Sequence, residues 1–101
     1  VFDRERLRLA YLDTLDRLSQ IYFDQECYSQ CIAACQLLLA RDRCREDAHC
    51  LLMRCYSRLG QHVQAMRQYH ICVEALKTEL DVVPEASTCQ LYEKIRLREE
   101  I

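Results

Sequence analysis

The sequence predicts an all-α domain, and three observations favour this class. Half of the 101 residues are hydrophobic, which is enough to form a buried core without a metal or a disulfide. The chain contains one glycine and one proline, so it lacks the turn residues that a β-rich fold needs. Apolar residues recur at intervals of three and four, which places their side chains on one face of a helix.

The apolar spacing predicts a first pair of helices in the N-terminal half of the chain. The first is expected over residues 3–24, with an inward stripe made of Leu7, Tyr11, Leu15, Leu18 and Tyr22. The second is expected over residues 28–41, with three side chains directed inward: Cys31, Cys35 and Leu38.

A second pair of helices is expected on either side of Gly60, the single glycine. The third helix is predicted over residues 45–59, where Glu46 and Asp47 complement the positive end of the helix dipole. Glycine adopts the left-handed backbone conformation at little steric cost, so Gly60 suits the turn between the two helices. The fourth helix is predicted over residues 62–80, with an apolar face made of Val63, Met66, Tyr69, Val73, Leu76 and Leu80.

Pro84 separates the fourth helix from a fifth, because proline cannot continue a helix. The fifth is predicted over residues 86–99 and is expected to cover the last open face of the stack, with Cys89, Tyr92 and Ile95 buried. Residues 1–101 are expected to form a single domain. The chain starts at Val1 and not at methionine, so we expect it to be a fragment of a longer protein.

Charge and composition argue against several classes of function. The net charge of -2 gives no general attraction to nucleic acid or to anionic lipid, and no apolar run is long enough to span a membrane. One glycine cannot form a phosphate-binding loop, and the three histidines show no catalytic signature with cysteine. We therefore expect no enzyme activity, no catalytic residues, no cofactor and no direct DNA binding.

The eight cysteines allow two interpretations. Cys27, Cys31 and Cys35 are four residues apart on one expected helix, where neighbouring side chains lie too far apart for a disulfide. We therefore expect a reduced, cytoplasmic protein in which cysteine packs as a small hydrophobic residue, with no metal site. The alternative is a Cys/His zinc-binding helical domain in which Cys27 and Cys31 share an ion. His49 is expected to be a packed histidine and not a ligand.

The chain also carries an internal repeat. A shift of 34 residues superimposes Leu18 on Leu52 and Tyr22 on Tyr56, and this is the period of tetratricopeptide repeats. The first copy has Glu26 where the turn glycine is expected. The second copy resembles the repeat pattern at Leu52, Tyr56, Leu59, Gly60, Ala65 and Tyr69. The prediction is a tetratricopeptide-like stack of two antiparallel helical hairpins plus a C-terminal capping helix.

Several motifs carry a more specific resemblance. They are "EDAHCLLM", the Gly60 turn, "AMRQYH", "EL" followed by "VVPE", and "LYEKI". With these motifs, residues 46–95 resemble the bacterial transcriptional activator domain, a tetratricopeptide-like module of SARP-type transcriptional regulators. The upstream "ERLRLAYLDTLDRLSQIY" also resembles the first helix of this family. Asp81 departs from the family pattern, which usually has glycine after "EL".

The resemblance implies a non-catalytic module for protein–protein interaction and dimerisation. In such regulators the module relays regulation to a DNA-binding domain that lies outside this chain. The expected partners are other domains of the same regulator, a second copy of the module, or the transcription machinery. A generic tetratricopeptide scaffold in a signalling protein is the other interpretation.

The resemblance also implies a partner site, because the first helix of each hairpin lines the concave surface of such stacks. Carboxylates and one exposed aromatic from the first helix are expected to face two guanidinium groups from the third. The alternative is that these side chains form only the solvated faces of two helices. The groove positions are Asp13, Asp16, Gln20, Phe23, Asp24, Asp47, Cys50, Arg54, Ser57 and Arg58.

Overall fold

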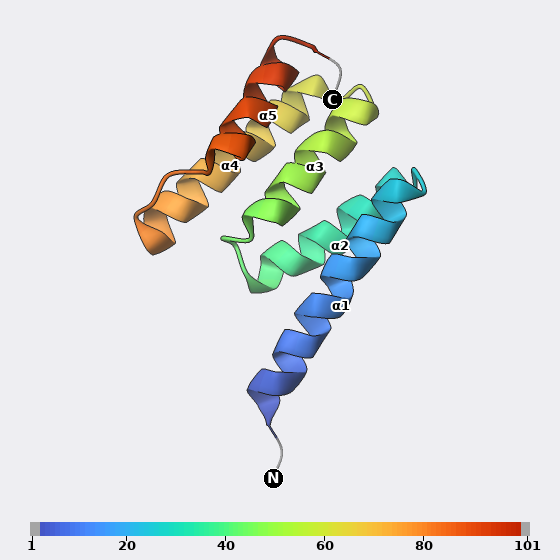
Figure 1. Cartoon of the computed structure of the whole chain (residues 1–101), viewed down its shortest axis with the longest axis vertical. Coiled ribbons are helices and arrows are strands. Elements are labelled where there is room, and N and C mark those ends of the chain that lie inside the picture. Colours follow the sequence, from blue (N-terminus) through green and yellow to red (C-terminus); the bar gives the residue numbers. More distant parts are fainter. Residues whose placement is uncertain (1–2, 100–101) are drawn as a thin grey trace.

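The computed structural model describes residues 3–99 as five helices, and it contains no strand in this range. They are α1 (Arg4–Asp24), α2 (Tyr28–Arg41), α3 (Glu46–Arg58), α4 (His62–Leu80) and α5 (Ala86–Arg96). The helices α1 and α2 form one hairpin and α3 and α4 a second, while α5 packs against both helices of the second hairpin (Figure 1). The predicted all-α class, the two stacked hairpins and the capping helix are confirmed.

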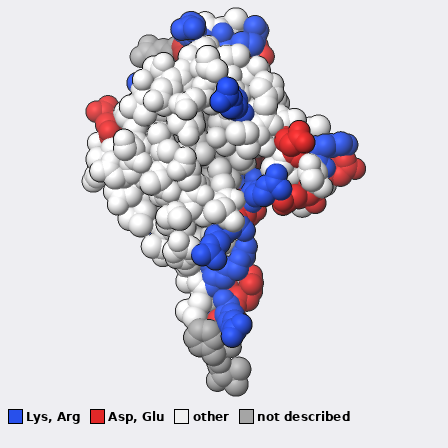
Figure 2. Space-filling model, turned by 180° about the vertical axis from the view of Figure 1, so that it is seen from behind, with Lys and Arg blue, Asp and Glu red and all other residues white. Residues whose placement is uncertain are grey.

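The helices form two layers. The Cα atoms span 52 × 34 × 18 Å, and Figure 1 shows α1, α3 and α5 in front with the paler α2 and α4 behind. Seen from behind, a broad part of the surface carries few charged side chains, as Figure 2 shows. No described helix is both long and apolar enough to cross a lipid bilayer.

The core consists of two clusters, and α3 contributes to both. The first joins α1, α2 and α3, and its buried residues are Leu12, Leu15, Cys31, Cys35, Leu38, Ala48, Leu51, Leu52 and Cys55. The second joins α3, α4 and α5 through Met53, Ala65, Leu91 and Ile95. Because α3 belongs to the second hairpin and also packs against the first, it links the two clusters into one stack.

The turns of the two hairpins have the same geometry although their sequences differ. Gly60 has φ of 76° and Glu26 has φ of 60°, so both lie in the left-handed region. In the second turn the Gln61 N–H donates to the Tyr56 carbonyl at 2.8 Å, and in the first the residues 34 positions earlier make the same bond at 2.8 Å. This bond pattern closes a helix after a left-handed residue. The repeat therefore extends to the turns.

The predicted inward stripe of α1 is wrong at its N-terminal end. Leu7 is 52% exposed, and Tyr11 and Leu18 are exposed as well. For Leu7 the reason is length, because α1 has 21 residues and α2 has 14, so the first turns of α1 extend beyond their partner (Figure 1). Leu18 lies in the C-terminal half of α1, where the buried face contains Leu15 and Ser19 instead. The residues of α1 that are buried are Leu12, Leu15 and Ser19.

The predicted faces of α4 and α5 also need correction. Val63 and Leu80 are exposed, while the buried positions of α4 are Ala65, Gln68, Cys72, Ala75 and Leu76. These residues are mostly small, so they allow close approach to α3, and the apolar periodicity alone favoured the larger side chains. In α5, Cys89 and Tyr92 are only half-buried, and the helix ends at Arg96 and not at Glu99.

Candidate functional site

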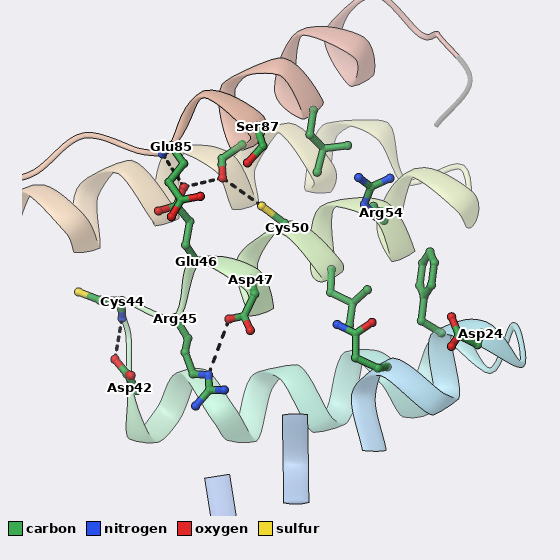
Figure 3. Close-up of a pocket in the computed structure, with 15 residues that line it drawn as sticks. Asp24, Asp42, Cys44, Arg45, Glu46, Asp47, Cys50, Arg54, Glu85 and Ser87 are labelled. Atoms are coloured by element: carbon green, nitrogen blue, oxygen red, sulfur yellow. Dashed lines mark hydrogen bonds and ion pairs between the residues drawn. The ribbon is translucent and has the colours of Figure 1, made fainter. Parts of the chain in front are cut away.

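A cleft of about 820 Å³ opens on the face formed by α1, α3 and α5. Its walls are the C-terminal part of α1, the α2–α3 connection, the exposed side of α3 and the start of α5 (Figure 3). The lining residues are Gln20, Phe23, Asp24, Asp42, Cys44, Arg45, Glu46, Asp47, Cys50, Leu51, Arg54, Glu85, Ser87, Thr88 and Leu91.

The cleft brings together six of the ten residues predicted for the groove. They are Gln20, Phe23 and Asp24 from α1, and Asp47, Cys50 and Arg54 from α3. The residues come from two consecutive hairpins, and the packing of α3 against α2 and α1 places them on one surface.

The two other predicted carboxylates on α1 lie outside the lining. Asp13 forms an exposed ion pair with Arg17 at 3.0 Å, as expected for residues four apart on a helix. Asp16 lies 3.7 Å from the guanidinium of Arg45, which does line the cleft. Asp16 therefore influences the cleft through a shared arginine.

The two remaining residues of α3 have local roles. The carbonyl of Ser57 accepts the Gly60 N–H at 3.1 Å, so this residue belongs to the turn. Arg58 donates to the Tyr28 hydroxyl at 3.0 Å, and its guanidinium lies 5.3 Å from the centre of the Phe23 ring. Arg58 thus contacts the ring of Phe23, which lines the cleft.

The prediction missed the residues that the α2–α3 connection and α5 contribute. These are Asp42, Cys44, Arg45, Glu46, Glu85, Ser87 and Thr88, with Leu51 and Leu91 in the floor. The groove residues were predicted from repeat positions on the first and third helices alone, because the capping helix has no counterpart in the repeat pattern. Its position depends on contacts between residues about forty positions apart.

Glu46 fixes α5 against α3. Its Oε2 atom accepts a hydrogen bond from the backbone N–H of Glu85 at 2.7 Å and another from the hydroxyl of Thr88. Glu85 is the N-cap of α5, where backbone N–H groups lack partners and the helix dipole favours a negative charge. The Thr88 hydroxyl also contacts the Cys50 thiol, with 3.2 Å between Oγ1 and Sγ. One wall of the cleft is therefore held by exposed and partly buried polar contacts between α3 and the start of α5.

The lining carries more negative than positive charge, with five acidic residues and two arginines. At one end, Asp16 and Asp47 share the guanidinium of Arg45, which lies 3.7 Å from each carboxylate. Burial raises the pKa of the Asp16 carboxyl, and the neighbouring charge of Asp47 raises it further. One arginine for two carboxylates leaves this end of the cleft negative.

The opposite end of the cleft has a different character. Figure 3 shows Arg54 and Asp24 at this end, away from the acidic group around Glu46 and Glu85. Within residues 3–99, the guanidinium of Arg54 has no ion-pair partner. The sequence predicted carboxylates on α1 and guanidinium groups on α3. In the structure the sign of the charge differs instead between the two ends of the cleft. Most of the acidic groups come from α3, α5 and the α2–α3 connection.

His49 is a packed histidine, as predicted. It is 2% exposed, with its Nε2 atom 2.7 Å from the carbonyl of Arg43 and its Nδ1 atom 2.8 Å from the side-chain amide of Gln68. A carbonyl can only accept, so Nε2 carries the proton and Nδ1 accepts from the amide N–H. Burial lowers the pKa of the imidazole. Both ring nitrogens are therefore used inside the core.

All eight cysteines are free thiols. Cys31, Cys35, Cys55 and Cys72 are completely buried, and burial raises the pKa of each thiol. Among residues 3–99, no three His, Cys, Asp or Glu side chains are grouped so that they could hold a metal ion. Cys31 lies in the core cluster of α2 and α3, whereas Cys27 lies at the N-cap of α2, so the pair does not share an exposed face. The buried thiols pack as small hydrophobic groups.

Comparisons with known proteins identify the family. A model described as the bacterial transcriptional activator domain matches residues 2–96, which is nearly the whole chain. No curated protein and no solved structure matched the chain in the same comparisons. The match covers all five helices, including α5 and the residues that line the cleft. The chain therefore belongs to the family of bacterial transcriptional activator domains, which are regulatory domains of transcriptional regulators.

Proposed function

We propose that this chain is a non-catalytic interaction module whose cleft binds a segment of another protein domain. The single observation that carries this proposal is the cleft between the hairpins, with a polar lining that includes one aromatic side chain. Two thiols line it. That of Cys50 is engaged with Thr88 and that of Cys44 with the carbonyl of Ala75, and burial raises the pKa of both. A thiol of this kind is a poor nucleophile at neutral pH, which supports a role in binding.

The charge pattern indicates the chemistry of the bound segment. The acidic end around Asp47 and Glu85 suits a lysine or arginine side chain, while Arg54 suits a carboxylate or a backbone carbonyl. Phe23 adds an aromatic surface to the lining. A segment with a basic residue at one end and an acidic one at the other would bind in a single direction.

Membership of the family supports a role for this interaction in transcriptional regulation, in the bacterial cytoplasm. The bound segment belongs to another domain of the regulator or to the transcription machinery, and a second copy of the module binds elsewhere. A surplus of carboxylates repels phosphate groups, so the cleft is unsuited to reading DNA. The module passes its state to a separate DNA-binding domain. The family match favours this role over that of a generic scaffold.

The proposal is tested with the double substitution Phe23→Ala and Arg54→Ala in the regulator that contains this chain. Activation of a reporter gene should fall at least about tenfold, because an aromatic anchor and a charged contact are both lost. The control is Tyr11→Ala with Arg17→Ala, which also removes one aromatic residue and one arginine, here from exposed positions of α1 outside the cleft.

Phe23 also packs against the core, so thermal unfolding must show that the double variant is folded. A second variant, Arg54→Glu, reverses the charge of a half-buried cleft residue without opening a cavity in the core. Normal activation by both variants, in folded protein at equal abundance, would show that the cleft is not the partner site.

A further inference from the structure

The face opposite the cleft has an unusual surface. No charged residue occurs from Cys27 to Ala40, although 30% of the chain is charged. This segment forms α2, whose outer side lies next to that of α4 on the rear of the molecule. Figure 2 shows this rear face as a broad surface with few charged side chains.

An apolar hollow lies between α2 and α4 on this face. Its volume is about 320 Å³, and its lining residues are Gln36, Leu39, Ala40, Arg43, His49, Leu52, Gln68, Ile71 and Ala75. At its edge Ile71 is 47% exposed, and Leu37 on the outer side of α2 is exposed to a similar degree. Large apolar side chains beside an apolar hollow are typical of a surface that a protein partner covers.

Two charged residues of α4 are placed so that they could form ion pairs with the same residues of a second copy. Arg67 and Glu74 are both exposed, and neither has an ion-pair partner within residues 3–99. They are seven residues apart, so they lie on the same side of the helix, and their midpoint falls between His70 and Ile71. A two-fold axis at this midpoint would set Arg67 of each copy opposite Glu74 of the other, which gives two ion pairs.

We propose that two copies of the chain associate through this face, with α4 packed antiparallel on the α4 of the second copy near Ile71. This inference rests on the proposed role as an interaction module and adds the place where self-association occurs. A two-fold interface brings a surface against itself, so it must contain opposite charges at symmetric positions or no charge. On α4, Arg67 and Glu74 meet this condition. In the same register Lys77 falls opposite Gln64 and Glu79 opposite His62, and both charges already have a partner in their own chain, Asp81 and Arg43, so no like charges face each other.

The cleft does not meet this condition. If two copies met through their clefts, the excess carboxylates of one would face those of the other. Self-association through the rear face therefore leaves both clefts open to other partners. The uncharged side of α2 flanks the paired helices, and its amides, among them Gln30 and Gln36, can both donate and accept hydrogen bonds across the axis. The hollow beside Ile71 provides space for apolar side chains of the second copy.

Charge reversal tests this interface. Sedimentation equilibrium should show that the chain dimerises, and that Arg67→Glu and Glu74→Arg each raise the dissociation constant about tenfold, because each creates two like-charge contacts. The combined variant Arg67→Glu with Glu74→Arg should restore the dissociation constant to within about threefold of the wild-type value, since both pairs are re-formed with exchanged charges. Both residues are exposed, so the variants should fold normally.

The control is Lys94→Glu, which makes the same change in net charge as Arg67→Glu at an exposed position of α5. It should leave the dissociation constant unchanged. A wild-type chain that stays monomeric at all concentrations, or a dimer that the single variants do not weaken, would overturn the proposal. Failure of the combined variant to restore the dimer would do the same. The cleft variants test a separate surface, so the two proposals can fail independently.

Discussion

The buried imidazole of His49 couples the stability of the domain to pH. In the folded chain its pKa lies below the ordinary value of 6.5, because burial disfavours the charged form. The unfolded chain therefore takes up a proton near pH 6.5 that the folded chain does not bind. The stability that the neutral imidazole provides is complete above pH 6.5 and is lost as the pH falls from there toward the folded pKa.

We expect the free energy of unfolding to fall between pH 7 and pH 5.5, with a slope of at most about 1.4 kcal/mol per pH unit from this one proton. Denaturant unfolding at several pH values measures the slope. His49→Gln should remove most of it, while His70→Gln, at an exposed position, should keep it. An unchanged slope in His49→Gln would contradict the prediction. Asp16, whose pKa is raised by burial, acts in the opposite sense, because its carboxyl binds a proton more readily in the folded chain than in the unfolded one.

The burial of His49 was predictable from the sequence, whereas that of its partner Gln68 was not. Its position on the third helix was enough to predict that His49 is packed. Its partner Gln68 was not predicted, because an amide counts as polar in an apolar pattern, and burial depends on the hydrogen bond that it donates to the imidazole. The stripe assigned to α4 was displaced for this reason and because Ala65, Cys72 and Ala75 are small.

At the level of the helix–turn–helix element, the two hairpins contain a natural comparison. Glu26 and Gly60 occupy equivalent turn positions, and both have positive φ. A side chain costs about 1 kcal/mol in this conformation. A Cβ atom at Gly60 would meet no atom within 4 Å, so only the backbone conformation opposes a side chain there.

We therefore expect Glu26→Gly to stabilise the domain by up to about 1 kcal/mol and Gly60→Ala to destabilise it by about the same amount. Thermal or denaturant unfolding of both variants measures the two effects against one wild type. As a control, Glu26→Ala keeps a Cβ atom and removes the charge, so it should change stability much less than Glu26→Gly. Equal stabilities for Glu26→Ala and Glu26→Gly would show that backbone conformation is not the cause.

The elements themselves were predictable to within a few residues, because helix ends depend on local signals such as Gly60 and Pro84. The cleft was predictable in part, since six of its residues lie at repeat positions. The rest required contacts between distant parts of the chain. The carboxylate of Glu46 caps a helix that begins about forty residues later, and no local pattern marks that partner.

At the level of the whole molecule, α3 couples the unfolding of the two hairpins, because it belongs to both core clusters. Leu52 and Cys55 belong to the cluster shared with α1 and α2, while Met53 belongs to the cluster shared with α4 and α5. α3 also packs against α2 of the first hairpin and against α4 of its own hairpin. If α3 unfolds, both clusters lose one side, so the domain should unfold in a single cooperative transition.

Leu52→Ala tests this coupling, because Leu52 is almost completely buried in the middle of α3. We expect a loss of about 2 to 5 kcal/mol in the free energy of unfolding, from lost apolar contacts and the cavity that remains. Native-state hydrogen exchange should show that the most protected amides of α2 and of α5 lose protection by the same amount. The control is Val82→Ala, at an exposed site between α4 and α5, which should change neither. If α5 kept its protection while α2 lost it, the hairpins would be separate folding units, and a signal bound in the cleft between them would have no rigid path from one to the other.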